Sequence, residues 1–137
     1  MTSFVYETTG QKIAFSDWSK PKQPDNHKNA EDCVDGNSFK RLWNDNSCGR
    51  SLSFVCEWPP TEFCLKGWTQ LGDKCYIIPK GKANQATAQG TCKKLGGVLV
   101  EPRDKTENKY VMNFVAKHFG RDEPFWMGIN DKAKEGR

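Results

Sequence analysis

Apolar residues over the first 58 positions come in short runs separated by polar, turn-forming residues, a pattern typical of short strands joined by loops. The runs at residues 4–6 and 13–15 flank a turn-forming sequence at residues 8–10, which predicts a hairpin. Two further short strands are predicted at residues 42–43 and 53–56. We therefore expect this part of the chain to be mostly β-structure.

Residues 19–38 show no core-facing pattern, because Pro, Asn, Asp and Lys dominate them. We expect one long loop here, and long loops in compact domains are usually functional or disordered. The potential oxygen ligands in this stretch favour a loop that is ordered around a metal ion. Residues 59–63 are predicted to be a linker, because Pro59 and Pro60 cannot join a central strand.

The second part of the chain opens with another hairpin pattern. Trp68 and residues 75–78 are predicted to lie in strands on either side of a turn at residues 71–74. Near the end, residues 125–129 predict a strand, and residues 130–131 open a polar loop that runs to the end of the chain.

Two helices are predicted between these strands. The first spans residues 85–95, where the apolar positions share one face and two glycines supply a stop directly afterwards. The second spans residues 105–119, where Asp104 can cap the start with Glu107 as its reciprocal partner. His118 lies on the apolar stripe of this helix, so we expect it to be packed rather than to serve as a ligand.

Composition and charge exclude several functional classes. A chain of 137 residues is one domain's worth of sequence, and five Trp and eight Phe supply an aromatic core. The formal charge of +4 is mild and the Lys and Arg residues are scattered, so no nucleic-acid partner is expected. No apolar run approaches the roughly 20 residues of a membrane helix, and residues 1–10 do not form a signal peptide. With two histidines, and no Ser or Cys visibly paired with a base, we expect no enzymatic activity.

The six cysteines are best interpreted as disulfides, because no two of them have the short spacing of a zinc site. Disulfides indicate an oxidising compartment, so the protein is expected to be secreted. Six cysteines allow many connectivities, and their spacing alone does not choose among them.

Carboxylates, side-chain amides and a proline gather in three short runs. These are Gln23-Pro24-Asp25-Asn26-His27, Glu31-Asp32-Cys33 and Trp43-Asn44-Asp45. Oxygen ligands of this kind suit a hard cation, above all Ca²⁺. The runs therefore predict a calcium site.

The same runs and the cysteines resemble the C-type lectin family. Residues 64–137 resemble the first half of its domain at Cys64, Gly67-Trp68, Cys75-Tyr76, Cys92, Gly96-Gly97 and the run from Trp126 to Asp131. Residues 1–58 resemble the second half at Phe4-Val5-Tyr6, Asp17-Trp18, the three oxygen-rich runs and Phe54-Val55-Cys56-Glu57. The resemblance implies an α+β fold in which two helices flank small antiparallel sheets, with a long calcium-binding loop.

The two halves of the family's domain stand here in reversed order, with residues 59–63 between them. We favour a circularly permuted single domain over residues 1–137, because domain termini are commonly close in space. A fragment that spans two tandem lectin domains and a unit of a domain-swapped assembly remain as alternatives, so a dimer or swapped oligomer is among the expected states. The resemblance implies three disulfides, Cys64–Cys75, Cys56–Cys92 and Cys33–Cys48.

The family's principal calcium site carries over to five positions, all with oxygen donors. These are Gln23, Asp25, Glu31, Asn44 and Asp45. Ca²⁺ takes 6 to 8 oxygen ligands, which leaves room for two sugar hydroxyls. The carboxylates would accept hydrogen bonds from the sugar, while the amide groups of Gln23 and Asn44 would donate.

An auxiliary calcium site of the family maps to Asn26, Glu31, Asp32, Asp131 and Glu135. All five residues retain oxygen donors, although Asn26 stands where an acid is frequent in the family. Two of the ligands come from the far end of this chain.

The order Gln-Pro-Asp goes with galactose-type sugars in the family, whereas Glu-Pro-Asn goes with mannose-type sugars. Exchanging the amide and the acid reverses which pair of hydroxyls fits the hydrogen-bond pattern. His27 could pack on a sugar face, or it could be a solvated loop histidine. Trp18, Trp43 and Trp126 are expected in the core, since the family buries them.

We therefore expect a secreted, calcium-dependent module that binds carbohydrate, of galactose type, without enzymatic activity. The competing hypothesis is a structural domain that binds protein or mineral instead of sugar. Biomineral matrices use domains of this family, and a calcium-loaded loop that touches carbonate would have the same sequence features.

Overall fold

The computed structural model describes residues 4–17 and 33–130, which form nine short strands and two helices. In chain order these are β1 (Val5–Tyr6), β2 (Cys33–Asn37), β3 (Leu42–Asn46), β4 (Ser53–Phe54), β5 (Cys56–Trp58), β6 (Thr69–Leu71), β7 (Lys74–Ile77), α1 (Gln85–Lys94), β8 (Val98–Leu99), α2 (Lys105–Phe119) and β9 (Pro124–Asn130). Among these residues no helix is long and apolar enough to cross a membrane.

The strands form two sheets, and each sheet combines strands from before and after residues 59–63. In the first, the order is β1-β9-β2-β3, and β4 adds to β9 as the single parallel pair among these described strands. In the second, the order is β6-β7-β5-β8, and all its pairs are antiparallel. The segments on either side of residues 59–63 are therefore interleaved within one fold.

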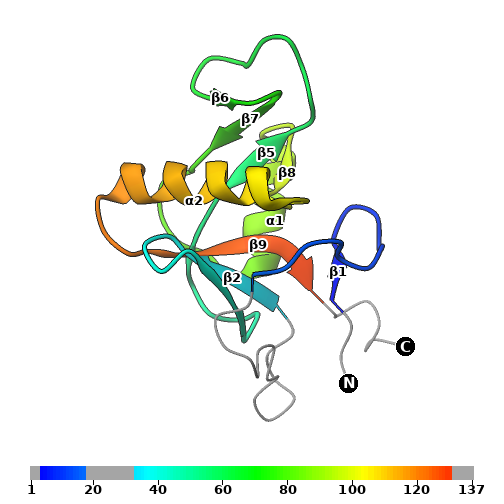
Figure 1. The fold of residues 1–137 in the computed structure, drawn as a ribbon, viewed down its shortest axis with the longest axis vertical. Helices are drawn as coiled ribbons and strands as arrows, with labels where there is room; N and C mark the ends of the chain where they lie inside the picture. The colour runs from blue at the N-terminus through cyan, green and yellow to red at the C-terminus, as the bar shows by residue number, and fades with distance from the viewer. Residues whose placement is uncertain (1–3, 18–32, 131–137) are drawn as a thin grey trace.

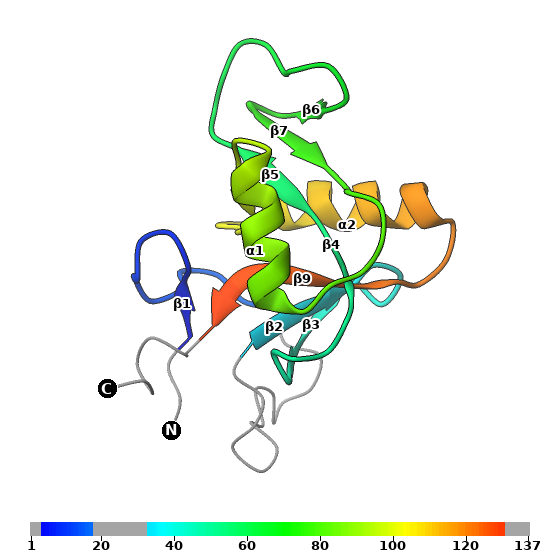
Figure 2. The same ribbon diagram turned by 180° about the vertical axis from the view of Figure 1, so that it is seen from behind.

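Strand β9 separates two cores, because successive side chains of a strand point to opposite faces. Phe125, Met127 and Ile129 pack in one core with the buried face of α2. Trp126 points the other way and packs in a second core with Ala88 of α1. The two helices accordingly lie on opposite sides of β9, with α2 in front in Figure 1 and α1 in front in Figure 2.

Both helices begin at a capping side chain. Asn84 Oδ1 accepts a hydrogen bond from the N–H of Thr87 at the start of α1, over 2.8 Å. Asp104 caps α2 in the same way through the N–H of Glu107, as predicted. The reciprocal half of that prediction is wrong, because the Glu107 carboxylate accepts from the N–H of Arg103 and binds Lys74 instead.

Two strand predictions need correction. The predicted loop over residues 19–38 is wrong for its last residues, because Cys33–Asn37 is strand β2, which lies between β3 and β9. Polar composition hid this strand, since its sequence contains Asp35, Gly36 and Asn37. In the first hairpin the turn forms, with Gly10 at a φ of 71°. Its second strand does not, because Lys12 makes only an isolated bridge to Val5.

His118 is exposed, contrary to the prediction that it is packed. It lies in the last turn of α2, where the helix and β6 leave a groove lined by Leu71 and Phe114 as well as by His118. Its ring makes an edge contact with Phe119 at a centroid distance of 4.7 Å. By contrast, Trp43 and Trp126 are fully buried, as expected, and Trp18 lies outside the described residues.

A buried ion cluster joins the second sheet to α2. The Lys74 ammonium lies 3.4 Å from the Glu57 carboxylate and 3.1 Å from that of Glu107. Glu57 also accepts the N–H of Glu101 over 3.0 Å. Burial raises the pKa of the Glu57 carboxyl to about 7, although the charge of Lys74 and the N–H of Glu101 oppose this shift. Burial alone would lower the pKa of Lys74, but the carboxylates of Glu57 and Glu107 outweigh it and raise that pKa.

The raised pKa of Glu57 makes its contribution to stability depend on pH. The folded state holds the proton more tightly than the unfolded state, whose pKa is near 4.5. The stabilisation is therefore complete below pH 4.5 and is lost as the pH rises through about 7. Between pH 4.5 and 8, wild-type protein is expected to lose about 3 kcal/mol more stability than Glu57→Gln.

Urea unfolding in EDTA at several pH values measures this difference without a contribution from calcium ligands. Glu62→Gln is the matched control, because this carboxylate is exposed in the linker. Equal pH slopes for wild type and Glu57→Gln would contradict the assignment.

Candidate calcium and sugar site

The last residues of β3 supply two of the predicted calcium ligands. Asp45 is 0% exposed, and Asn44 is half-buried beside it. The side-chain amide of Asn44 donates to the main-chain carbonyl of Asp45 over 2.9 Å, so this side chain and this carbonyl lie together. The carboxylate of Asp45, its carbonyl oxygen and the amide oxygen of Asn44 are all hard donors. This donor set fits Ca²⁺ rather than a softer metal.

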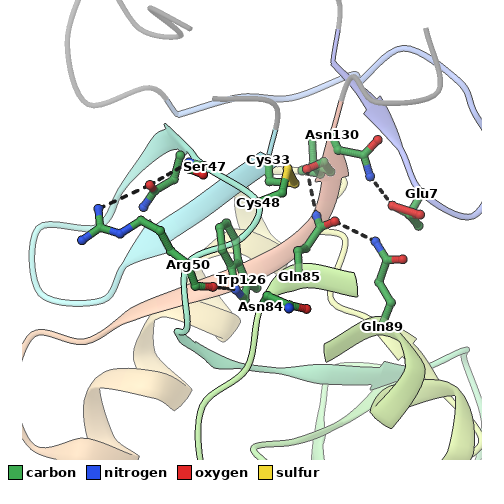
Figure 3. Close-up of a disulfide and its surroundings, with 12 residues drawn as sticks. Glu7, Cys33, Ser47, Cys48, Arg50, Asn84, Gln85, Gln89, Trp126 and Asn130 are labelled. Atoms are coloured by element: carbon green, nitrogen blue, oxygen red, sulfur yellow. Dashed lines mark hydrogen bonds between the residues drawn. A yellow bond between two sulfur atoms is a disulfide. The ribbon is translucent and has the colours of Figure 1, made fainter. Parts of the chain in front are cut away.

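Three strand ends meet beside these residues. Cys33, at the start of β2, pairs with Asn46 of β3 on one side and with Asn130 of β9 on the other. The Cys33–Cys48 disulfide ties this end of β2 to the chain just after β3 (Figure 3). Cys33 directly follows Glu31-Asp32 in the sequence, and Asn130 directly precedes Asp131. Cys33, Asn46 and Asn130 therefore lie side by side at one end of the sheet. The predicted ligand segments are next to these three residues in the sequence.

A buried polar network supports the end of β3. The amide of Asn46 donates to the carboxylate of Asp35 over 2.8 Å, and both side chains are buried. The amide oxygen of Asn46 accepts the N–H of Ser47 over 2.8 Å and a guanidinium N–H of Arg50 over 3.4 Å. Because hydrogen-bonded neighbours orient metal ligands, this network would hold Asp45 in place.

A second network holds the end of β9 (Figure 3). Gln85 of α1 is fully buried and donates to the carbonyls of Met127 and Ile129, over 3.0 and 3.4 Å. Gln89 donates to Gln85 over 2.8 Å. The side-chain amide of Asn130 donates to the carboxylate of Glu7 on the β1 side. The chain therefore leaves β9 from a position fixed on both sides.

Sequence reasoning missed the supporting residues Asp35, Asn46 and Gln85. The signal was present for Asp35 and Asn46, since both are polar residues inside short runs that lie between half-cystines. Gln85 had no usable signal, because a glutamine at the start of a helix is ordinarily solvated.

The remaining predicted ligands lie outside the described residues. They are Gln23, Asp25, Asn26, His27, Glu31, Asp32, Asp131 and Glu135. Within residues 4–17 and 33–130, no three His, Cys, Asp or Glu side chains gather in a way that could hold a metal ion. The complete ligand set therefore stays a prediction, and Asn44 and Asp45 are its described members.

The three disulfides match the connectivity that the resemblance implied. Cys33 is bonded to Cys48, Cys56 to Cys92 and Cys64 to Cys75, and none of the cysteines is free. A family model described as the lectin C-type domain matches residues 81–137. Residues 81–137 are therefore similar to the C-type lectin domain.

Known relatives agree with this assignment. The galactose-specific lectin nattectin of Thalassophryne nattereri is 33% identical over 76 residues, which cover 56% of this chain and 48% of nattectin. A perlucin-like protein of Mytilus galloprovincialis is 32% identical over 73 residues, which cover 53% of this chain and 47% of that protein. The chain spans about half the length of these two relatives. No solved structure gives a significant match.

One relative aligns over nearly the whole chain. The human C-type mannose receptor 2 is 27% identical over 137 residues, which cover 93% of this chain and 9% of the receptor. This chain therefore corresponds to a small part of a much longer protein.

Proposed function

We propose that this chain binds carbohydrate through a calcium ion held between the long loop and the end of β3. The observation that carries the proposal is the meeting of three strand ends at Cys33, Asn46 and Asn130, directly beside Asn44 and Asp45. Each strand end leads into, or lies next to, a predicted ligand segment. The nattectin relationship supports a sugar as the ligand.

The proposed ligands have different roles, which follow from their chemistry. Gln23, Asp25, Glu31, Asn44 and Asp45 would hold the principal ion, which supplies two coordination positions for vicinal sugar hydroxyls. The carboxylates would accept the hydroxyl protons, and the amides would donate to the hydroxyl oxygens. His27 would pack against the sugar ring. Asn26, Glu31, Asp32, Asp131 and Glu135 would hold an auxiliary ion that orders the loop.

We further propose a galactose-type preference, a secreted location and no catalytic role. The Gln-Pro-Asp order supports the preference, and the three disulfides support an oxidising, extracellular location. All predicted acids would serve as metal ligands in this proposal, which would leave none of them for acid–base chemistry. The domain presents a binding surface only.

The reversed order of the halves is proposed to produce one closed domain over residues 1–137. Pairing of β9 with β1 and β2, and of β5 with β7 and β8, joins the two segments in both sheets. The match to the mannose receptor over 93% of this chain supports a natural rather than an engineered order.

Isothermal titration of calcium-loaded protein with galactose and then mannose tests the sugar preference. Galactose is expected to bind about tenfold more tightly than mannose, a difference of about 1.4 kcal/mol. The double exchange Gln23→Glu/Asp25→Asn should reverse the preference, because it swaps an acid and an amide at the ion.

His118→Ala is the control for these titrations, since it removes an exposed ring on α2 and leaves the loop unchanged. A preference that survives the double exchange would refute the specificity proposal. Absence of saturable binding to either sugar would favour the protein- or mineral-binding alternative.

A further inference from the structure

The segment between β5 and β6 presents two large apolar side chains to solvent. Phe63 is 83% exposed and Leu65 is 58% exposed, more than any other large apolar side chain among the described residues. The segment has no regular structure and projects beyond the second sheet at the top of Figure 1. Neither side chain contributes to either core.

The main chain of this segment makes few hydrogen bonds to the rest of the fold. The Thr61 hydroxyl donates to the Phe63 carbonyl over 3.3 Å, Gln70 donates to the Thr61 carbonyl over 3.4 Å, and Cys64 is bonded to Cys75. Thr61 donates its N–H to the carbonyl of Asp73, and Trp68 donates to that of Leu65, each over 3.0 Å. Between these two bonds, the N–H groups of Glu62 and Phe63 donate to no acceptor in the described parts of the chain. An endopeptidase binds its substrate as an extended strand. A segment with few backbone hydrogen bonds needs little free energy to adopt that conformation.

We propose that residues 59–66 form a processing site for an endopeptidase that cleaves after large apolar residues, at Phe63 or Leu65. Water supplies hydroxide to the carbonyl carbon and a proton to the amide nitrogen as the peptide bond breaks. The products are a new carboxylate and a new amino group. The nearby Trp58–Pro59 bond resists such enzymes, because proline follows the aromatic residue.

Within residues 4–17 and 33–130, the other exposed large apolar residues have main-chain N–H groups that are hydrogen-bonded. Phe39 is 54% exposed, but its N–H donates to Asp122 over 3.0 Å within the tight turn between β2 and β3. Leu95 caps α1, and its N–H donates to the carbonyls of Thr91 and Cys92. Cleavage at either place would require the surrounding element to open first.

The fold would survive the cut. Strands β5 and β7 stay paired on either side of it, with Cys56 opposite Ile77 and Trp58 opposite Cys75. The Cys56–Cys92 disulfide links the two pieces covalently wherever the cut falls. After cleavage at Phe63 it is the sole covalent link, because Cys33–Cys48 lies within one piece and Cys64–Cys75 within the other. Processing therefore makes covalent integrity depend on that bridge.

Brief digestion of the native protein with chymotrypsin tests the proposal. We expect a single cut after Phe63 or Leu65, two pieces on a reducing gel and one species on a non-reducing gel. The near-UV circular dichroism should stay unchanged without reductant and disappear when reductant is added to the cut protein.

Phe63→Ser/Leu65→Ser should slow the cut at least about tenfold, whereas the control Phe39→Ser should be cut at the wild-type rate. Three results would each overturn the proposal. These are a first cut elsewhere, an unchanged rate in the double variant, and loss of the near-UV signal on cutting without reductant.

Discussion

Millimolar EDTA is expected to release this protein completely from immobilised galactose, and excess calcium should restore its binding. The sugar hydroxyls and the protein ligands share one ion in the proposed site, so removal of the ion removes the direct contacts and loosens the loop. The ligand carboxylates would also repel one another without it. Elution profiles with and without EDTA measure the effect directly.

The variant Asp45→Asn tests whether the loss of binding in EDTA is caused by loss of the calcium ion. The variant keeps the size of a buried side chain but removes one negative charge from the ligand set. Calcium affinity is expected to fall by at least about tenfold, because ligand charge sets affinity in such sites. Asp122→Asn is the matched control, since that carboxylate accepts the N–H of Phe39 in a turn away from the β3 end. Retention on the resin in EDTA would refute calcium-dependent binding.

Removal of the Cys56–Cys92 bridge, by Cys56→Ser/Cys92→Ser, should be the most damaging loss among the disulfides. The two residues are 36 positions apart in sequence and fully buried in the core that contains Trp126. On the chain-entropy model a loop of this length is worth about 4 kcal/mol. Burial of two serine hydroxyls in an apolar site adds a further cost.

Thermal unfolding of this double variant, compared with Cys64→Ser/Cys75→Ser, tests the ranking. The Cys64–Cys75 loop spans 11 positions, so the same model assigns it about 3 kcal/mol. The midpoint should fall further for the Cys56/Cys92 pair. An equal or smaller fall would show that the bridge adds little to the interleaved sheets.

Local signals were enough to predict much of the fold. The helix start at Asp104 and the turn before Lys74 follow from capping and turn chemistry, which act over a few residues. The family resemblance supplied the disulfides, which spacing alone left open. The wrong predictions concern features that depend on contacts between residues far apart in the sequence. Cys33–Asn37 is a strand because β3 and β9 lie on either side of it, and His118 is exposed because β6 does not cover the last turn of α2.

The candidate calcium site shows the same difference between local features, which were predicted, and long-range contacts, which were not. Asn44 and Asp45 were predicted from donor chemistry, and the structure places them at the end of β3. Their support by Asp35 and Asn46 depends on the register between β2 and β3, which no local pattern specifies. The role of Gln85 depends on the approach of α1 to β9, which is a tertiary contact.

The interleaving of early and late strands also bears on biosynthesis. Strand β2 leaves the ribosome long before β9, the strand that must lie beside it, has been translated. The nascent chain therefore exposes an apolar, half-formed sheet, which must not aggregate before the last strand emerges. Cys33 and Cys48 can bond early, whereas Cys56 must wait for Cys92, so premature pairing with a nearer thiol is the natural kinetic trap. Efficient production would then call for a disulfide isomerase in the same compartment.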